Sequence, residues 1–287
     1  MSDKNTFFHQ KSTLNVRGTL LDLSSPKVMG IVNITPDSFY DGGETYTVGK
    51  AVTQAGRMLE EGAAIIDLGA YSSRPNAEHI STESEIERLI PALRAIVKEY
   101  PQAIISIDTF RSAVARAAIY DGAHIVNDIS GGEMDQEMFR TMAELKVPYI
   151  LMHMKGTPQT MVQEAKYINL FEEVFQYFLD KAGLLREAGV IDIILDPGFG
   201  FAKTADQSFE LLNKLDQFKL LELPLLAGMS RKSMICRTLD VSPDHALNGT
   251  TAANTIALLK GANILRVHDV KAAAEAIKIV ERTIAVQ

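Results

Sequence analysis

Short apolar segments rich in β-branched residues recur eight times along the chain, and this repetition restricts the fold more than any other feature. Each segment has the length of a strand, and apolar residues at helical spacing fill the chain between them. Strand and helix therefore alternate, which predicts parallel strands covered by helices. The predicted strands are residues 28–35, 64–70, 103–109, 124–130, 147–154, 192–198, 224–230 and 264–270.

The number of strands decides between two parallel-sheet architectures. Eight strand–helix units in roughly 250 residues match a (β/α)8 TIM barrel better than a doubly wound sheet, which commonly has fewer strands. Residues 12–24 alternate loosely around Arg17-Gly18, which predicts a hairpin that could close the bottom of the barrel. We therefore expect an α/β fold, a (β/α)8 TIM barrel with an N-terminal hairpin. Glycines that end a helix just before the next strand support this alternation of helix and strand. They are Gly62, Gly122, Gly189 and Gly261.

Composition and charge exclude several classes of protein. The 287 residues are 46% hydrophobic and 23% charged, and no linker interrupts them, so we expect a single domain over residues 1–287 with the barrel at about 28–285. Cys236 is the one cysteine, which excludes an internal disulfide. A net charge of −7 without a basic tract disfavours a nucleic-acid partner. No segment reaches the roughly 18 apolar residues of a membrane span, and we expect a soluble cytoplasmic protein.

Polar residues stand at the end of every predicted strand, whereas the strand starts carry no comparable cluster. Barrel enzymes place their chemistry at the carboxyl ends of the strands and in the loops that follow. The sequence therefore predicts a polar site at the top of the barrel. The residues at these ends are Asn33, Asp67, Ser72, Ser73, Arg74, Asp108, Asn127, Asp128, His153, Asp196, Ser230, Arg231, Lys232, Ser233, Arg266, His268 and Asp269.

Two groups among these residues indicate ligand chemistry. Arg266 and His268 lie two apart in a strand and share a face, which indicates an anion clamp; the alternative is an arginine paired with a neighbouring carboxylate. Asp108, Asn127 and Asp196 suit a heterocycle with adjacent N–H donors, such as an aminopyrimidinone. The alternative is that they tie down loops, because an Asp before Pro-Gly is an ordinary turn residue.

Eight collinear motifs resemble those of the dihydropteroate synthase family, from residue 28 to about 275. One of them departs from the common family form, because Tyr71, Ser73 and Asn76 stand in the second loop where the family has other residues. Tyr71 could alter the packing of that loop. The motifs are GIVNITPDSF at 30–39, SSRP at 72–75, SIDT at 106–109, NDI at 127–129, MHM at 152–154, DPGFGF at 196–201, SRKS at 230–233 and RVHDV at 266–270.

The resemblance implies a transferase of folate biosynthesis. Such an enzyme condenses 6-hydroxymethyl-7,8-dihydropterin diphosphate with 4-aminobenzoate, giving 7,8-dihydropteroate and diphosphate. Diphosphate leaves with the help of Mg²⁺ before the arylamine attacks. Sulfonamides are the expected inhibitors, and a homodimer built on the late helices around residues 244–285 is the expected assembly.

The resemblance also assigns residues to roles. Asp108, Lys232 and Arg266 would be catalytic, and Asn33 would help to hold Mg²⁺ on the diphosphate. The pterin pocket would be formed by Asp108, Asn127, Asp196 and Lys232, with Met152, Ile129 and Gly228 as apolar walls. The phosphate oxygens would meet Arg74, Arg266 and His268, and 4-aminobenzoate would lie among Phe39, Ser73, Pro75, Phe201, Lys232 and Ser233.

Three alternatives stay open. A pterin-binding methyltransferase on a similar barrel would use Asp108, Asn127 and Asp196 without handling diphosphate. A phosphate-handling barrel such as an aldolase would use Lys232 as an imine former, and a depressed lysine pKa would support it. A non-catalytic pterin sensor would keep the pocket alone. His153, at the end of the fifth predicted strand, is interpreted as structural.

Overall fold

The strands that alternate with helices form one parallel barrel. The computed structural model describes residues 11–34, 43–72 and 79–285, with side chains of the second range from residue 48 on. Within them, eight parallel strands follow the order β8-β7-β6-β5-β4-β3-β10-β9. A bridge between Leu195 and Leu225 joins the two ends of that order. The strands are β3 (Lys27–Asn33), β4 (Ile65–Gly69), β5 (Ile104–Asp108), β6 (Ile125–Asp128), β7 (Tyr149–Met152), β8 (Ile193–Asp196), β9 (Leu226–Ala227) and β10 (Ile264–Val267).

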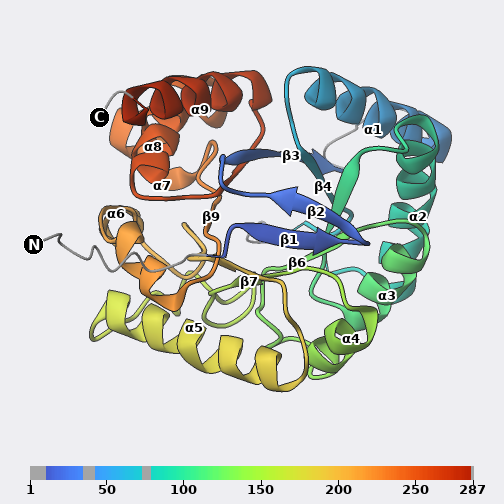
Figure 1. The fold of residues 1–287 in the computed structure, drawn as a ribbon, viewed down its shortest axis with the longest axis horizontal. Helices are drawn as coiled ribbons and strands as arrows, with labels where there is room; N and C mark the ends of the chain where they lie inside the picture. Colours follow the sequence, from blue (N-terminus) through green and yellow to red (C-terminus); the bar gives the residue numbers. More distant parts are fainter. Residues whose placement is uncertain (1–10, 35–42, 73–78, 286–287) are drawn as a thin grey trace, which may run out of the picture.

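Helices alternate with these strands and surround them (Figure 1). The predicted (β/α)8 barrel is therefore confirmed. The four helix-ending glycines at 62, 122, 189 and 261 all have positive φ, between 95° and 110°, as the sequence predicted. The helices are α1 (Gly43–Glu60), α2 (Thr82–Glu99), α3 (Ser112–Tyr120), α4 (Met138–Leu145), α5 (Leu170–Glu187), α6 (Ala205–Asn213), α7 (Ser233–Leu239), α8 (Leu247–Leu259) and α9 (Val270–Ile284).

The predicted hairpin is present and closes one end of the barrel. Strands β1 (Thr13–Val16) and β2 (Thr19–Asp22) pair antiparallel and lie across the middle of the ring of helices (Figure 1). Arg17 and Gly18 turn the chain with φ of 51° and 89°. The hairpin buries apolar side chains against the first residues of the barrel strands, and this bottom cluster consists of Leu14, Val16, Leu23, Met29, Ile65, Ile125, Ile150, Ile194, Leu226 and Ile264.

The strands are shorter than the apolar runs predicted. The clearest case is the seventh run, predicted as residues 224–230, of which only Leu226–Ala227 is strand. The chain leaves the sheet there because the residues that follow line a cavity instead of continuing the ladder. At the end of β8, Gly198 has φ of 69°, which a strand cannot accommodate.

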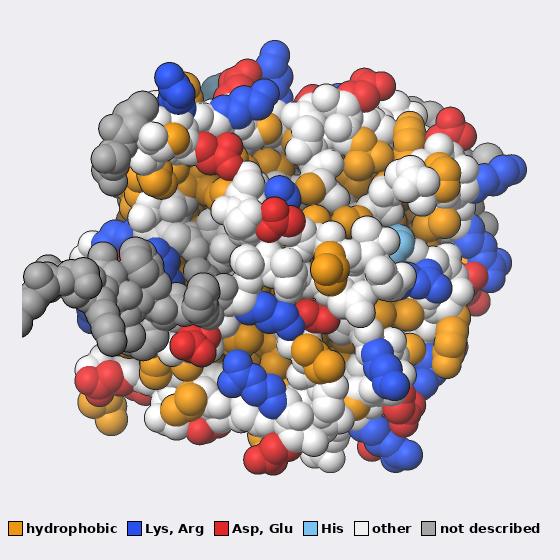
Figure 2. All heavy atoms as spheres, viewed as in Figure 1, with side chains coloured by type: hydrophobic (Ala, Val, Ile, Leu, Met, Phe, Trp, Pro, Cys, Tyr) orange, Lys and Arg blue, Asp and Glu red, His pale blue; other side chains and the backbone are white. Residues whose placement is uncertain are grey.

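The surface carries charges of both signs, as the charged residues of the sequence indicate. On the face that the hairpin covers, Lys and Arg side chains alternate with Asp and Glu, and apolar side chains lie between them (Figure 2). Among the side chains that Figure 2 draws in colour, Lys and Arg do not gather into a stripe. None of the helices in the described ranges is long and apolar enough to cross a membrane.

Candidate active site

A cavity of about 570 Å³ opens at the carboxyl ends of the barrel strands. Phe39, Ser73, Arg74 and Pro75 lie outside the described residues. The structure brings every other residue assigned by resemblance to this cavity. Its lining includes Asn33, Asp108, Asn127, Ile129, Met152, Asp196, Phe201, Gly228, Lys232, Ser233, Arg266 and His268.

Strand register explains this convergence. Asp108 at the end of β5 is the register partner of Asn127 in β6, and Met152 in β7 is the partner of Asp196 in β8. Residues at one level of neighbouring parallel strands project from the same ring of the barrel. The polar strand ends therefore meet above the apolar interior.

Arg266 lies at the centre of an ion-pair network inside this cavity. Its Nε donates to Asp67 Oδ2 at 2.6 Å, and its NH2 group donates to Asp108 Oδ2 at 2.6 Å. Asn127 Nδ2 donates to the same Asp67 oxygen at 3.1 Å. The structure thus shows the second interpretation of Arg266, pairing with carboxylates. The two pairs use two of about five guanidinium N–H groups, which leaves donors for a phosphate oxygen.

Burial favours the uncharged form of each ionisable group in the cavity, so it raises the pKa of the carboxylates and lowers the pKa of the lysine. Burial raises the pKa of Asp108 to about 7, opposed by Arg266 and reinforced by Asp67. Burial also raises the pKa of Asp196, opposed chiefly by Lys232. In the other direction, burial lowers the pKa of Lys232 to about 8, opposed chiefly by Asp196. In each case the neighbouring opposite charge acts against burial and favours the ionised form.

Lys232 lies between a carbonyl group and an aromatic ring. Its Nζ donates to the backbone oxygen of Phe199 at 2.5 Å and lies 4.5 Å from the centroid of the Phe201 ring. Cation–π attraction and the carbonyl dipole both favour the protonated amine. They place the positive charge beside the ring that the resemblance assigns to 4-aminobenzoate.

His268 is a neutral donor rather than a cation. Burial, followed by the charge of Arg266, lowers its pKa to about 4. Ser230 Oγ accepts the backbone N–H of His268 at 3.2 Å and lies 3.1 Å from His268 Nδ1. The Ser230 hydroxyl can also donate its proton to Nδ1, and in that tautomer the ring proton is on Nε2. A neutral ring N–H donor fits an anion, but with less attraction than an imidazolium.

Asp196 forms the turn that the sequence allowed and also lines the cavity. Its Oδ1 accepts the N–H of Gly198 at 2.8 Å, as a turn residue would. Its Oδ2 is the atom nearest to where a β-carbon on Gly228 would stand, at 3.8 Å. A side chain at Gly228 would therefore project between Asp196 and Arg266, and glycine keeps that space available for a ligand.

The apolar wall of the cavity belongs to a separate cluster of buried side chains. Met152 is 1% exposed and Ile129 is 5% exposed. An apolar wall beside a few polar groups is typical of a small-molecule site. The mouth cluster consists of Tyr71, Phe110, Ile129, Met152, Met154, Met161 and Ala202, with Phe201, Ile80 and Met134 packed against it.

Several residues of the site were not assigned by sequence reasoning. Asp67 is fully buried and holds Arg266, yet it was noted only as a strand-end residue. Tyr71 and Met161 line the cavity, as does Arg231, whose guanidinium pairs with Asp269 at 2.7 Å. An unassigned acidic residue at the end of a barrel strand, as at Asp67, is the signal that could have been used.

A resident metal centre is not formed by the described residues, among which no group of three or more His, Cys, Asp or Glu side chains could hold an ion. Asn33 brings one amide oxygen to the cavity. One protein oxygen fits Mg²⁺ only when phosphate oxygens and water complete its shell. The residues present therefore fit a metal that arrives with its substrate.

His153 is structural, as interpreted from the sequence. It is 3% exposed, its Nδ1 lies 2.9 Å from Lys203 Nζ, and its ring packs edge-on against Tyr177. Burial lowers the pKa of His153 well below the usual value, and the charge of Lys203 adds to the effect.

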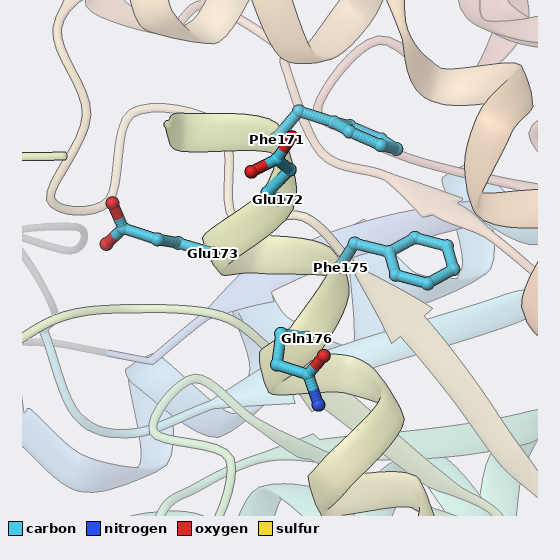
Figure 3. Close-up of a pocket in the computed structure, with 5 residues that line it drawn as sticks. All are labelled: Phe171, Glu172, Glu173, Phe175 and Gln176. Carbon is cyan, nitrogen blue, oxygen red and sulfur yellow. The ribbon is translucent and has the colours of Figure 1, made fainter. Parts of the chain in front are cut away.

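A second hollow, of about 420 Å³, lies on the outer side of α5. Phe171 and Phe175 point to one side of the helix and Glu173 points to the other (Figure 3). Both phenylalanines pack on Phe218, and Glu173 pairs with Lys155 at 2.6 Å. Polar groups do not converge here as they do at the barrel mouth, so we assign it no ligand.

The barrel and its cavity define a class of protein, one that holds a flat, N–H-bearing heterocycle together with an anion. A family described as pterin binding enzyme matches residues 29–268. Dihydropteroate synthase of Escherichia coli K12 is 45% identical over 273 residues, covering 94% of this chain and 96% of the relative. The Synechocystis dihydropteroate synthase is 48% identical over 257 residues, covering 88% and 89%.

Solved structures of dihydropteroate synthases also match most of this chain. A dihydropteroate synthase from Yersinia pestis, in complex with a sulfonamide drug, matches with a TM-score of 0.89 and 40% identity, covering 95% of this chain and 99% of that one. The Xanthomonas albilineans enzyme in complex with 7,8-dihydropteroate matches with a TM-score of 0.86 and 35% identity, covering 96% and 100%. The chain belongs to the dihydropteroate synthase family.

Proposed function

We propose that this protein is a dihydropteroate synthase that joins 6-hydroxymethyl-7,8-dihydropterin diphosphate to 4-aminobenzoate and releases diphosphate. The observation that carries the proposal is the meeting of Asp196, Asn127, Lys232 and Arg266 in one cavity. Hydrogen-bond acceptors for a heterocycle and cations for a leaving group are combined there. Relatives that bear this name, and a structure holding 7,8-dihydropteroate, support it.

Asp196 would recognise the pterin ring. Its carboxylate can accept two parallel hydrogen bonds from the 2-amino group and the adjacent ring N–H. Protonation would remove one of these acceptor positions, and the N–H of Gly198 helps to keep the carboxylate ionised. Met152 and Ile129 would pack against the ring face, in the space that Gly228 leaves open.

Arg266 and Asp108 would act on the bond that breaks. Negative charge grows on the departing diphosphate, and the remaining N–H groups of Arg266 stabilise it more in the transition state than in the ground state. Asp108 lies beside Arg266 and would stabilise the positive charge left on the pterin methylene. Bound Mg²⁺, held through Asn33 and the diphosphate oxygens, would add Lewis-acid stabilisation of the leaving group.

Lys232 would orient both partners without forming a covalent bond. Its Nζ is directed at a backbone carbonyl and an aromatic ring, and with a pKa of about 8 it remains mostly protonated at neutral pH. Imine formation needs the neutral amine. A depressed lysine pKa is the direction that an imine former would need, so it is the family match that disfavours the aldolase alternative.

Inhibition by sulfonamides, the location of the enzyme and its assembly are part of the same proposal. Sulfonamides would compete with 4-aminobenzoate, and the enzyme would work in the cytoplasm as a homodimer. Leu247, Ile256 and Leu259 on α8 are 44%, 45% and 56% exposed, which supports an interface on the late helices. Ala253 and Ala257 are buried and serve the barrel core instead.

The test is an assay of the purified protein with dihydropterin methyl diphosphate, with and without Mg²⁺ and 4-aminobenzoate. Diphosphate release and formation of 7,8-dihydropteroate, followed by mass, are expected, and both should stop when the metal is chelated. Tight pterin binding without diphosphate release under any of these conditions would contradict the proposal and favour a sensor or a methyltransferase.

A further inference from the structure

Tyr71 lies at the mouth of the cavity. Its side chain is 8% exposed and lines the cavity beside Ser72 and Met161. The ring packs edge-on against Phe110, with centroids 4.9 Å apart, and the guanidinium of Arg111 lies 5.4 Å from its centroid. These contacts hold the ring in place without using its hydroxyl group.

The hydroxyl of Tyr71 joins two segments that are distant in the sequence. Gln159 Nε2 donates to it at 3.0 Å, and His79 Nδ1 lies 3.2 Å from it. His79 belongs to the segment between β4 and α2, whereas Gln159 belongs to the segment between β7 and α5. One side-chain oxygen therefore fixes two barrel-top segments relative to each other.

The hydrogen-bond chain continues from His79 to the barrel body. Arg111 donates to the backbone oxygen of Ile80 at 2.6 Å and lies 3.3 Å from His79 Nε2. Because arginine can only donate, His79 Nε2 is the acceptor in this contact, and Nδ1 is the ring atom that faces the Tyr71 hydroxyl. Arg111 is itself ion-paired with Glu85, which is fully buried and accepts from Thr109 at 2.7 Å.

The two ends of the cavity differ in chemistry. Asp108, Asn127, Asp196 and Arg266 stand on or directly at strands, where the pterin would bind. Tyr71 belongs to the apolar mouth cluster, above those strand ends. A change at Tyr71 should therefore alter binding of the second substrate while leaving the strand-end groups in place.

We propose that Tyr71 is a positioning residue for the arylamine substrate: its hydroxyl, bonded to Gln159 and His79, holds Gln159 against the mouth cluster, on which Phe201, the ring assigned to 4-aminobenzoate, also packs. The inference rests on the proposed function. It predicts that loss of the hydroxyl raises the KM for 4-aminobenzoate and leaves the KM for the pterin diphosphate and kcat nearly unchanged.

The experiment compares Tyr71→Phe, Gln159→Leu and the double variant with the unaltered protein. Loss of one neutral hydrogen bond should raise the KM for 4-aminobenzoate by about 3- to 10-fold in each single variant. The double variant should show no larger rise than the stronger single variant, because both changes break the same contact. Tyr120→Phe, which removes a hydroxyl from a 73% exposed side chain on α3, is the matched control and should leave all constants unchanged.

The outcomes separate the inference from the proposed function. Gln159 is exposed, so its replacement tests the contact even if Tyr71→Phe impairs folding. An unaltered protein that makes no dihydropteroate would overturn the proposed function and this inference together. Active protein whose Tyr71→Phe and Gln159→Leu variants keep the KM for 4-aminobenzoate, or raise both KM values equally, would overturn the inference alone.

Discussion

The two ends of the barrel are built from the same eight strands but use opposite chemistry. At the bottom, Leu14 and Leu23 of the hairpin region pack on apolar side chains at the strand starts, such as Ile125. At the top, only a few residues further along the strands, Asp108 and Arg266 form a partly buried ion pair. Buried apolar contacts stabilise the fold, whereas buried charges cost desolvation and are kept for ligand chemistry.

The comparison predicts that top and bottom substitutions affect different measurements. A top variant should lose activity with little change in stability, and a bottom variant should do the reverse. A top variant that lost stability, or a bottom variant that lost activity, would show that the two ends are coupled through the strands. The predictions below test it, starting with the largest expected effect.

Lys232→Met should have the largest effect on activity. Removing one preorganised cation from a buried site should lower kcat/KM for dihydropteroate formation by about 10²- to 10³-fold. The free energy of unfolding should change by less than about 1 kcal/mol, because the desolvation that lowers the pKa of Lys232 is relieved as its attraction to Asp196 is lost. Steady-state kinetics and urea unfolding measure the two quantities.

The control for this variant is Lys278→Met, which removes an exposed cation from α9. It should leave both kinetics and stability unchanged. A Lys232→Met protein that kept full activity would contradict the assignment of Lys232, and one that unfolded would show that the top of the barrel is needed for stability.

Leu14→Ala should have the largest effect on stability. Leu14 is fully buried in the bottom cluster, and its truncation should lower the free energy of unfolding by about 2 to 5 kcal/mol. The kcat of the protein that remains folded should be unchanged, since the cavity lies at the other end. Leu20→Ala, on the same hairpin but 69% exposed, is the matched control and should change stability by less than about 0.5 kcal/mol.

A drop in kcat for Leu14→Ala, measured below its unfolding temperature, would contradict the division between the two ends. It would mean that packing at the strand starts sets the positions of the strand ends. Urea unfolding followed by circular dichroism, with the kinetic assay on the same preparations, decides between these outcomes.

The sequence predicted the features that depend on local pattern, but not the contacts between residues far apart in the chain. The alternation of strands and helices, the hairpin and the polar strand ends follow from local pattern, and the structure agrees with each. Pairing of Arg266 with a carboxylate was one of the two interpretations, but Asp67 was not identified as its partner, because periodicity gives the strand face of a residue and not the side chain that it meets two strands away. Tyr71 was predicted only to alter packing, since its partner Gln159 lies 88 residues away.

The pH dependence of activity should sharpen the comparison further. Asp108 acts as an anion and gains its charge above a pKa of about 7, whereas Lys232 acts as a cation and loses its charge above a pKa of about 8. The value of kcat/KM should therefore be greatest between these pH values and fall by about tenfold per unit well outside them. The bottom cluster contains only apolar side chains, so its packing should not depend on pH over the same range.

The corresponding measurement is a profile of kcat/KM from pH 5.5 to 9.5, with circular dichroism at each pH as a control for folding. Asp108→Asn should lower activity and remove the acidic limb of the profile. An acidic limb that survived this substitution would assign it to another group and contradict the role of Asp108.

Gly18→Ala should have the smallest effect and tests the hairpin turn alone. Gly18 has φ of 89°, and no heavy atom lies within 4 Å of the position of an added β-carbon, so the cost is backbone strain of about 1 kcal/mol. Gly183→Ala is the matched control: it adds the same methyl group in equally open space but within α5, where alanine should stabilise by about 0.5 to 1 kcal/mol. The two variants should therefore shift the unfolding temperature in opposite directions while kcat stays the same. A lower kcat in Gly18→Ala would show that the hairpin reaches the active site through the barrel, which the separation of the two ends forbids.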